Sequence, residues 1–206
     1  MDVKFRKFKL CDLCRLVSLL DKEWELGDRE SSFGRKVYSL IYAMEVLKGS
    51  NVLLSYTVNG SPIGFVGYGS TSFSLKNAPL KLLATFLEKL FWMIPFLKNK
   101  VSNKLYYWSY DYLPINLKNY FDSELSMLIL DDVYRGKGLG KIMFFKICKM
   151  ASENGYKKMK IYTDNASNWK FYLKNGCRKK LEKEIFFCDG DSERVFVLEK
   201  DLEKKG

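Results

Sequence analysis

The pattern of hydrophobic and polar residues predicts a chain that alternates between strands and helices. Alternating or continuous apolar segments are typical of strands, and they occur at residues 3–10, 51–58, 62–73, 125–130, 158–163, 181–187 and 194–198. Apolar residues spaced three and four apart predict helices at residues 12–24, 35–47, 138–154 and 167–175. Asn59-Gly60 lies between two of these strands and is a typical hairpin turn. This order predicts a single domain over residues 1–206 with an insertion at about 75–121.

Composition agrees with one domain that has no disulfide framework. The chain has 206 residues, of which 47% are hydrophobic and 16% aromatic, and it can therefore bury a sizeable core. The first ten residues mix charges with apolar side chains and contain no secretory apolar region, so we expect a cytoplasmic protein. Its five cysteines are an odd number, which argues against a disulfide framework. Cys11 and Cys14 form a lone C-x-x-C in a chain without histidine, and we expect no metal site.

A glycine-rich loop follows the strand at 125–130 and leads into the helix at 138–154. Three glycines and two cations alternate in this loop, as Arg135, Gly136, Lys137, Gly138 and Gly140. Glycine lets a backbone approach a ligand closely, and a helix N-terminus offers unpaired N–H groups with a partial positive charge. The loop therefore predicts an anion site, most often one for phosphate, with the two cations as additional donors. The alternative is a tight turn with solvated charges.

The spacing of the glycines narrows the choice of phosphate ligand. No Walker A sequence is present, and the spacing G-x-G-x-G differs from the dinucleotide fingerprint G-x-G-x-x-G. Asp164 lies near the distance at which that fingerprint has an acidic residue, so this distance alone does not exclude a nucleotide. The pattern that fits better is R-x-x-G-x-G after an apolar strand, with Arg135, Gly138 and Gly140 at its fixed positions.

Residues 124–176 resemble the core of the GNAT superfamily of acyl-CoA-dependent N-acyltransferases. The loop is one signal, and the segment NASNWKFYLKNG is the second. This segment is similar to the family pattern N-x-x-A/S-x-x-F-Y-x-K-x-G, with matching residues at Asn165, Phe171, Tyr172, Lys174 and Gly176. The sequence departs from the family at three positions, where Asp132 replaces proline, Asn168 a small residue and Cys177 an aromatic residue.

The resemblance implies the fold and the binding of acetyl-CoA. The expected fold is α/β (α+β), with a central mixed, mostly antiparallel, twisted sheet flanked by helices and interrupted by the insertion. The pyrophosphate of acetyl-CoA would lie on the loop backbone, at Arg135, Gly136, Lys137, Gly138, Leu139 and Gly140. The pantetheine amides would pair with the strand edge at Leu128, Ile129 and Leu130. Asn165 would bond to the pantetheine arm, although a loop or helix-capping asparagine is the alternative.

The reaction needs an acid and a base, and the first candidates are Tyr172 and Glu124. Tyr172 matches a family position, and its ordinary pKa of about 10 suits a general acid that protonates a departing thiolate; the alternative is a core aromatic beside Phe171. Without histidine, the amine proton must go to a carboxylate, a water chain, a tyrosine or a neutral substrate amine. Glu124 lies where many family members have a catalytic glutamate, and its rivals are Asp111 and Asp122. Any of the three can instead be a solvated carboxylate.

The insertion contains an apolar helical pattern at 78–100, followed by an aromatic run. Charged residues interrupt the apolar pattern at Lys81, Glu88 and Lys89, and a membrane span needs about 20 apolar residues. We therefore expect no membrane span. The alternatives are a lid over the acceptor site, a homodimer surface, an interfacial membrane helix and an extra core helix. The aromatic run is our candidate for the acceptor pocket wall.

The sequence is compatible with three functions. The first is an N-acyltransferase that moves an acetyl group from acetyl-CoA to a primary amine of a small molecule or peptide. The second is a CoA-binding regulatory module, and the third is a membrane-surface adaptor. The net charge of +11 also permits nucleic acid. However, no nucleic-acid-binding motif is present, and the several negative charges of CoA account for a positive field, so nucleic acid is not expected.

Overall fold

The computed structural model describes residues 3–23, 32–71, 78–79, 82–83, 85–86, 89, 117, 119–186 and 192–202. Most of the insertion therefore lies outside the described residues. The same is true of Asp111, one of the three candidate bases.

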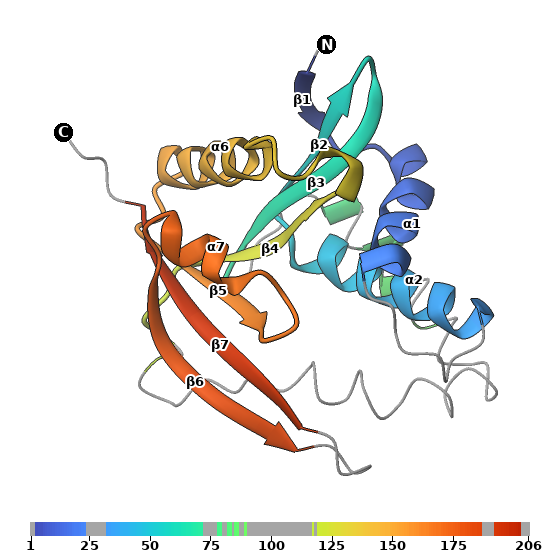
Figure 1. Cartoon of the computed structure of the whole chain (residues 1–206). Coiled ribbons are helices and arrows are strands. Elements are labelled where there is room, and N and C mark those ends of the chain that lie inside the picture. Colours follow the sequence, from blue (N-terminus) through green and yellow to red (C-terminus); the bar gives the residue numbers. More distant parts are fainter. Residues whose placement is uncertain are drawn as a thin grey trace.

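A sheet of seven strands forms the centre of the described structure, in the spatial order β1-β2-β3-β4-β5-β7-β6 (Figure 1). Its strands are β1 (Val3–Lys7), β2 (Val52–Val58), β3 (Ser61–Ser70), β4 (Ser123–Leu130), β5 (Lys158–Asp164), β6 (Arg178–Phe186) and β7 (Ser192–Asp201). All neighbours are antiparallel except β4 and β5, which are parallel. The mixed, mostly antiparallel sheet flanked by helices confirms the expected fold class.

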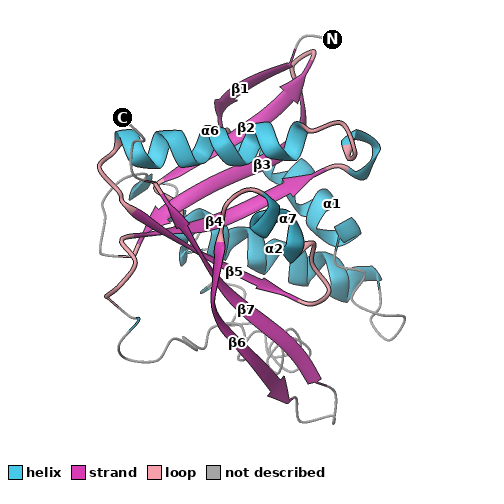
Figure 2. Cartoon of the chain, turned by 60° about the vertical axis from the view of Figure 1, so that its left-hand side comes forward, coloured by secondary structure: helices cyan, strands magenta, loops and turns pink. Residues whose placement is uncertain are grey.

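Helices cover both faces of the sheet (Figure 2). The helices described from end to end are α1 (Leu13–Glu23), α2 (Ser32–Gly49), α6 (Leu139–Glu153) and α7 (Trp169–Lys174), with short 3-10 turns at η1 (Leu10–Asp12) and η2 (Asp132–Tyr134). Apolar side chains of α6 pack on one face of the sheet, and those of α1 and α2 pack on the other. The candidate residues on the middle strands of the sheet therefore lie between α6 and α7 on one face and α2 on the other.

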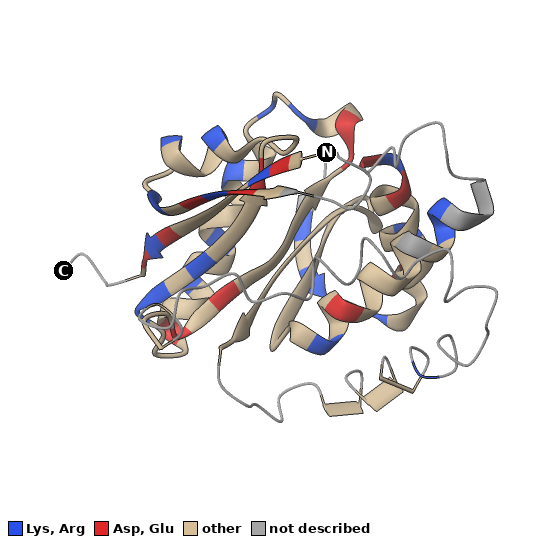
Figure 3. Cartoon of the chain, turned by 90° about the horizontal axis from the view of Figure 1, so that it is seen from below, with Lys and Arg blue, Asp and Glu red and all other residues tan. Residues whose placement is uncertain are grey.

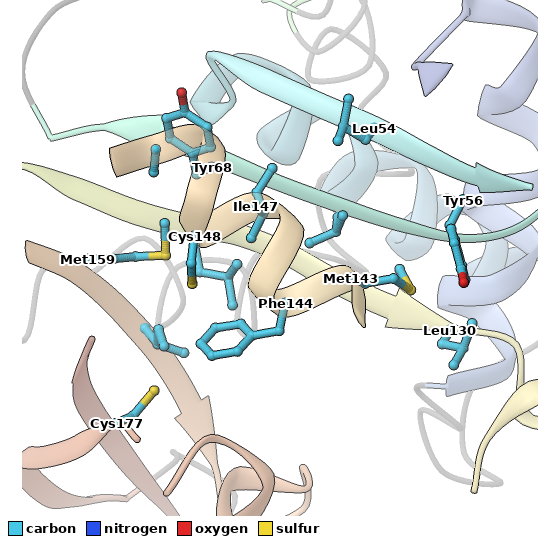
Figure 4. Close-up of a cluster of buried hydrophobic side chains, with 14 of the residues drawn as sticks. Leu54, Tyr56, Tyr68, Leu130, Met143, Phe144, Ile147, Cys148, Met159 and Cys177 are labelled. Atoms are coloured by element: carbon cyan, nitrogen blue, oxygen red, sulfur yellow. The ribbon is translucent and has the colours of Figure 1, made fainter. Parts of the chain in front are cut away.

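The larger core lies under α6. Met143, Phe144 and Ile147 follow the helical spacing that the sequence predicts, and all three are fully buried. Figure 4 shows the three side chains among those of the strands, with Ile147 toward Tyr68 and Met143 toward Leu130. Because these contacts hold α6 firmly on the sheet, the beginning of α6 has a defined position beside the end of β4.

Most of the expected elements are confirmed, with small shifts at their ends. The first strand ends at Lys7 rather than at residue 10, because the chain turns there into η1. The hairpin turn has left-handed backbone at Asn59 (φ 49°) and Gly60 (φ 84°), as its sequence predicts. The last two strands are longer than expected. Their many charged residues obscure the strand pattern, but pairing between β6 and β7 extends both strands.

Asp12 links β1, η1 and β2 through a buried carboxylate. It accepts two hydrogen bonds from Arg6 at 2.6 and 2.7 Å, one from the Lys9 N–H at 2.9 Å and one from the Ser55 hydroxyl at 2.8 Å. Burial raises the pKa of Asp12, but these hydrogen bonds outweigh the burial and hold the pKa below its ordinary value. The ionised carboxylate therefore stabilises the fold.

We expect Asp12→Asn to lower the free energy of unfolding by about 2 kcal/mol at neutral pH, since it removes one partner of a buried ion pair. A lowered folded-state pKa contributes stability above the unfolded pKa of about 3.9, and this contribution is lost as the pH falls through the folded-state pKa. The difference between variant and parent should therefore shrink in acid. Urea unfolding at neutral and acidic pH measures it, and an equal difference at both would contradict this role for Asp12.

Candidate functional site

Strands β4 and β5 separate shortly after they begin. Their pairing comprises two positions, Ser123 with Met159 and Glu124 with Lys160, whereas β4 stays paired with β3 as far as Leu130. Beyond Glu124, the β5 side of β4 has no ladder partner in the described residues. We call this opening between the two strands the slot. It leaves the backbone edge at Leu128, Ile129 and Leu130, where the sequence predicts a binding edge, without a neighbouring strand on this side among the described residues.

A β-bulge in β4 contributes to this separation. The register of β4 against β3 shifts between Gly67 and Tyr68, which leaves Ser126 as the extra residue. As a result, Leu125 packs in the core under α6 and Met127 packs in the core under α1 and α2. A bulge bends its strand and increases the local twist, and this one closely follows the last position at which β4 pairs with β5. Nothing in the sequence distinguishes Ser126 as a bulge residue.

The glycine-rich loop lies at the end of β4 and opens α6. Gly136 and Gly138 have φ of 75°, and a Cβ at either would have no heavy atom within 4 Å. Left-handed backbone, rather than crowding, therefore favours glycine at both positions. Gly138 is the N-cap of α6, and no side chain caps this helix.

The N–H groups of this loop are available to a ligand. Those of Lys141 and Ile142 donate to the Gly138 carbonyl at 3.1 and 3.2 Å. In contrast, the N–H groups of residues 136–140 donate to no acceptor among the described residues. A left-handed loop followed by an uncapped helix N-terminus has the geometry and the partial charge of an anion site.

The side chains of Arg135 and Lys137 brace the loop. Arg135 Nε donates to the Leu130 carbonyl at 3.0 Å, and its guanidinium also pairs with Glu23 of α1. Lys137 Nζ donates to the Val133 carbonyl at 3.2 Å. Both cations therefore have partners within the protein, and the backbone N–H groups are the donors of this loop that have none among the described residues.

Further ion pairs join the turn before this loop to α1. Asp131 pairs with Arg15 and lies 3.7 Å from Lys22. Lys22 also pairs with Asp132 at 2.5 Å, and this hydrogen bond is the main cause that lowers the pKa of Asp132 to about 2. Asp132 is one of the three departures from the family pattern, and here it ties the turn to α1.

Tyr172 lies on α7 and belongs partly to the core. Its ring centroid is 5.6 Å from that of Phe144 and 5.2 Å from that of Phe171. Burial raises the pKa of Tyr172, and Cys177, Tyr42 and Asp164 nearby raise it further. Tyr42 lies on α2, in the opposite helical layer. The ring thus has the core packing of one interpretation, and its role as a general acid stays a prediction.

Glu124 lies at the closed end of the slot and pairs with Lys160, with Oε2 and Nζ 2.9 Å apart. Its rival Asp122 accepts the Lys157 and Lys158 N–H groups at 2.7 and 3.0 Å. Both Asp122 oxygens therefore hold the start of β5. Sequence reasoning overlooked Lys160 because its partner is on another strand.

Asn165 extends the pairing of β5 with β7. Its side-chain oxygen accepts the Arg194 N–H at 3.0 Å, and its own N–H donates to the Arg194 carbonyl at 2.9 Å. This arrangement supports the loop alternative that the sequence left open. The role of Asn165 toward pantetheine stays a prediction.

No group of three or more histidine, cysteine, aspartate or glutamate residues in the described part of the chain could hold a metal ion. Within the same ranges, no helix combines the length and the apolar character that a membrane span requires. Cys11 and Cys14 are exposed free thiols in these ranges, and Cys148 and Cys177 are buried ones.

Solved structures with the same fold cover nearly all of the chain. An N-acetyltransferase from Staphylococcus aureus Mu50 shares 15% identity, with a TM-score of 0.58 and coverage of 98% of this chain and 100% of that one. The Salmonella typhimurium protein yncA, solved with its cofactor acetyl-CoA, shares 13% identity (TM-score 0.56, coverage 100% and 97%). The paia N-acetyltransferase from Thermoplasma acidophilum, in complex with coenzyme A, shares 16% identity (TM-score 0.53, coverage 98% and 99%).

These identities support the fold, and family membership depends on the sequence model. No curated protein matches the chain. The family model described as "Acetyltransferase (GNAT) family" matches residues 16–177, which include the glycine-rich loop, the slot and α7. The match spans well over half of the 206 residues, and the chain therefore belongs to the GNAT acetyltransferase family.

Proposed function

We propose that this protein is an N-acyltransferase that transfers an acetyl group from acetyl-CoA to a primary amine. The observation that carries the proposal is the continuity of the slot with the loop at residues 136–140. The loop offers free N–H groups, the slot offers a free strand edge, and both lie at the same end of β4. This combination suits a long ligand with a pyrophosphate at one end and an amide-containing arm at the other.

The parts of the donor would be held by different groups of the protein. The pyrophosphate would bind the backbone N–H groups of the loop at residues 136–140. Arg135 supports this loop through its hydrogen bond to the Leu130 carbonyl. The pantetheine amides would pair with β4 along Leu128, Ile129 and Leu130. The slot would then direct the thioester toward Glu124 and Tyr172.

The reaction forms one C–N bond and breaks one C–S bond, with two proton transfers. The amine nitrogen attacks the thioester carbonyl carbon, and a backbone N–H of β4 stabilises the negative oxygen that develops. The C–S bond then breaks, and its electron pair leaves on sulfur. Tyr172 donates a proton to this thiolate, and Glu124 takes the proton that the amine nitrogen loses, directly or through water. Glu124 then releases its proton to solvent and the Tyr172 phenolate takes one from solvent, which restores both groups.

Thioester consumption in the presence of an amine panel tests the proposal. The panel should hold a polyamine, an aminoglycoside antibiotic, a peptide with a free N-terminus and a peptide with an internal lysine. We expect at least one amine to accelerate thiol release and to gain an acetyl group by mass spectrometry. If CoA binds but no amine, including lysine side chains on a proteome-wide peptide library, is acetylated, the CoA-binding module replaces the transferase.

Replacement of the proposed base should give a pH-dependent loss. Glu124→Gln should lower kcat/KM about 10- to 100-fold at low pH, where most amine molecules carry a proton that must be removed. Raising the pH should restore part of the activity, because the acceptor then arrives neutral. The measurement is a kcat/KM–pH profile on an identified acceptor. A loss of the same fraction at every pH would instead assign Glu124 to substrate positioning.

A further inference from the structure

Four charged residues lie side by side across β4, β5, β7 and β6. Glu124 is paired in register with Lys160, Lys160 with Glu199, and Glu199 with Arg178. We call these four residues the charge row. Residues that are directly opposite on neighbouring strands project from the same face of the sheet, so the signs alternate across that face. Figure 3 shows charged residues of both signs on the strands of this half of the sheet.

The two middle members of the charge row are buried. The Lys160 side chain is 10% exposed, and the Glu199 side chain is 0% exposed. A buried charge is costly unless an opposite charge or hydrogen bonds compensate it. Lys160 and Glu199 therefore each depend on ion-pair partners, and their partners differ.

Glu199 pairs with cations other than Lys160. It lies 2.5 Å from Arg178 and 3.1 Å from Lys180. Burial raises the pKa of Glu199, but interactions with Tyr120, Arg178 and Lys180 outweigh the burial and lower the pKa to about 2. Glu199 should consequently stay ionised and paired even without Lys160.

Lys160, in contrast, is paired with Glu124, a candidate residue of the site. Its Nζ lies 2.9 Å from Glu124 and 4.4 Å from the ring centroid of Tyr162. Glu124 and Lys160 form the last paired position before β4 and β5 separate. The ammonium therefore holds the 36% exposed Glu124 side chain at the closed end of the slot.

We propose that Lys160 is a positioning residue, which holds the Glu124 carboxylate in place at the closed end of the slot. This inference rests on the proposed function, in which Glu124 accepts the amine proton. Another ionisable group near Glu124 is Tyr42 of α2, whose pKa is raised by burial and then by Glu124 and Asp164. The β3 residue opposite Glu124 is Gly69, which adds no charge. Lys160 is thus the cation paired with Glu124 in the described structure.

Lys160→Met tests this role, because methionine keeps much of the apolar stem and removes the charge. Without the ammonium, the Glu124 carboxylate is no longer held in place, so the variant should behave like a weaker form of Glu124→Gln. Its kcat/KM should fall about tenfold at low pH, where the amine proton must be removed, and should recover at high pH, where the acceptor arrives neutral. The KM for acetyl-CoA should not change.

Two further variants separate positioning from stability. Lys160→Arg keeps the charge and should restore the parent profile. Lys158→Met is the matched control, since Lys158 lies on the same strand and packs on the ring of Tyr120, 3.7 Å from its centroid, rather than on Glu124. Lys158→Met should keep the parent profile. A parent-like profile in Lys160→Met, or an equal loss at every pH, would overturn the proposal.

An activity-independent measurement keeps this test distinct from that of the proposed function. Carbon-13 NMR of glutamate carboxyls at neutral pH, with the Glu124 signal assigned through Glu124→Gln, reports the surroundings of the Glu124 carboxylate directly. Its chemical shift should change in Lys160→Met and return toward that of the parent in Lys160→Arg, and an unchanged chemical shift in Lys160→Met would overturn the proposal. A changed chemical shift in a protein that neither binds nor consumes acetyl-CoA would instead leave the charge row intact and refute the transferase.

Discussion

Gly140→Glu is expected to lower the affinity for CoA by at least about 100-fold while the protein stays folded. Gly140 is the second residue of α6, and a Cβ there would lie 3.9 Å from the Phe171 ring, an ordinary contact. A carboxylate in the first turn of a helix is favourable for the helix itself. It would, however, face the pyrophosphate at a distance where each pair of like charges costs roughly 1–4 kcal/mol.

Matched variants at the same position separate charge from size. Gly140→Ala should bind CoA almost as the parent does, because the methyl group fits, and Gly140→Gln should show an intermediate loss. Gly138 is less suitable, since its φ of 75° would strain any other residue. Calorimetric affinity and circular dichroism should be measured together. A folded Gly140→Glu protein with the parent's affinity would show that the loop does not hold the pyrophosphate.

Tyr172→Phe is expected to lower kcat by about 10²–10⁴-fold, the usual contribution of a general acid, if departure of the thiolate limits the rate. Phenylalanine keeps the ring contacts with Phe144 and Phe171, so the melting temperature should change little. The KM for acetyl-CoA should also change little, because the hydroxyl matters when the sulfur leaves. Thiol release at saturating acetyl-CoA and acceptor measures the effect.

The environment of Tyr172 also predicts the pH range in which it can act. Burial raises the pKa of Tyr172 above its ordinary value, and the phenol therefore keeps its proton at neutral and mildly alkaline pH. The parent enzyme should show no loss of kcat from this group below about pH 10. Parent-like turnover by Tyr172→Phe on an identified acceptor would mean that solvent protonates the thiolate.

Local sequence patterns were sufficient for most of the elements and for the loop. Met143, Phe144 and Ile147 form a buried face at helical spacing, and this spacing is visible in the sequence alone. Gly136 and Gly138 have the left-handed backbone that glycine permits most readily. In both cases neighbouring residues determine the conformation, so a short segment contains the information.

Features that depend on contacts between distant segments were not visible in this way. The slot depends on the bulge at Ser126 and on where β5 stops pairing with β4. The Arg135 guanidinium pairs with Glu23, and the Asn165 side chain pairs with Arg194. The partner of Glu124 is Lys160 on another strand. No local pattern specifies these partners, since each contact forms only when the sheet and helices have come together.

Calorimetric titration of the full chain with CoA tests the central claim most directly, because binding of the donor does not require the acceptor to be known. We expect saturable binding at one site per chain and a matching rise in the melting temperature. Stabilisation should reach about 2.7 kcal/mol when CoA is present at about 100 times its Kd, and Gly140→Glu should show neither effect. The absence of both heat and melting shift in the parent protein at millimolar CoA would contradict the account.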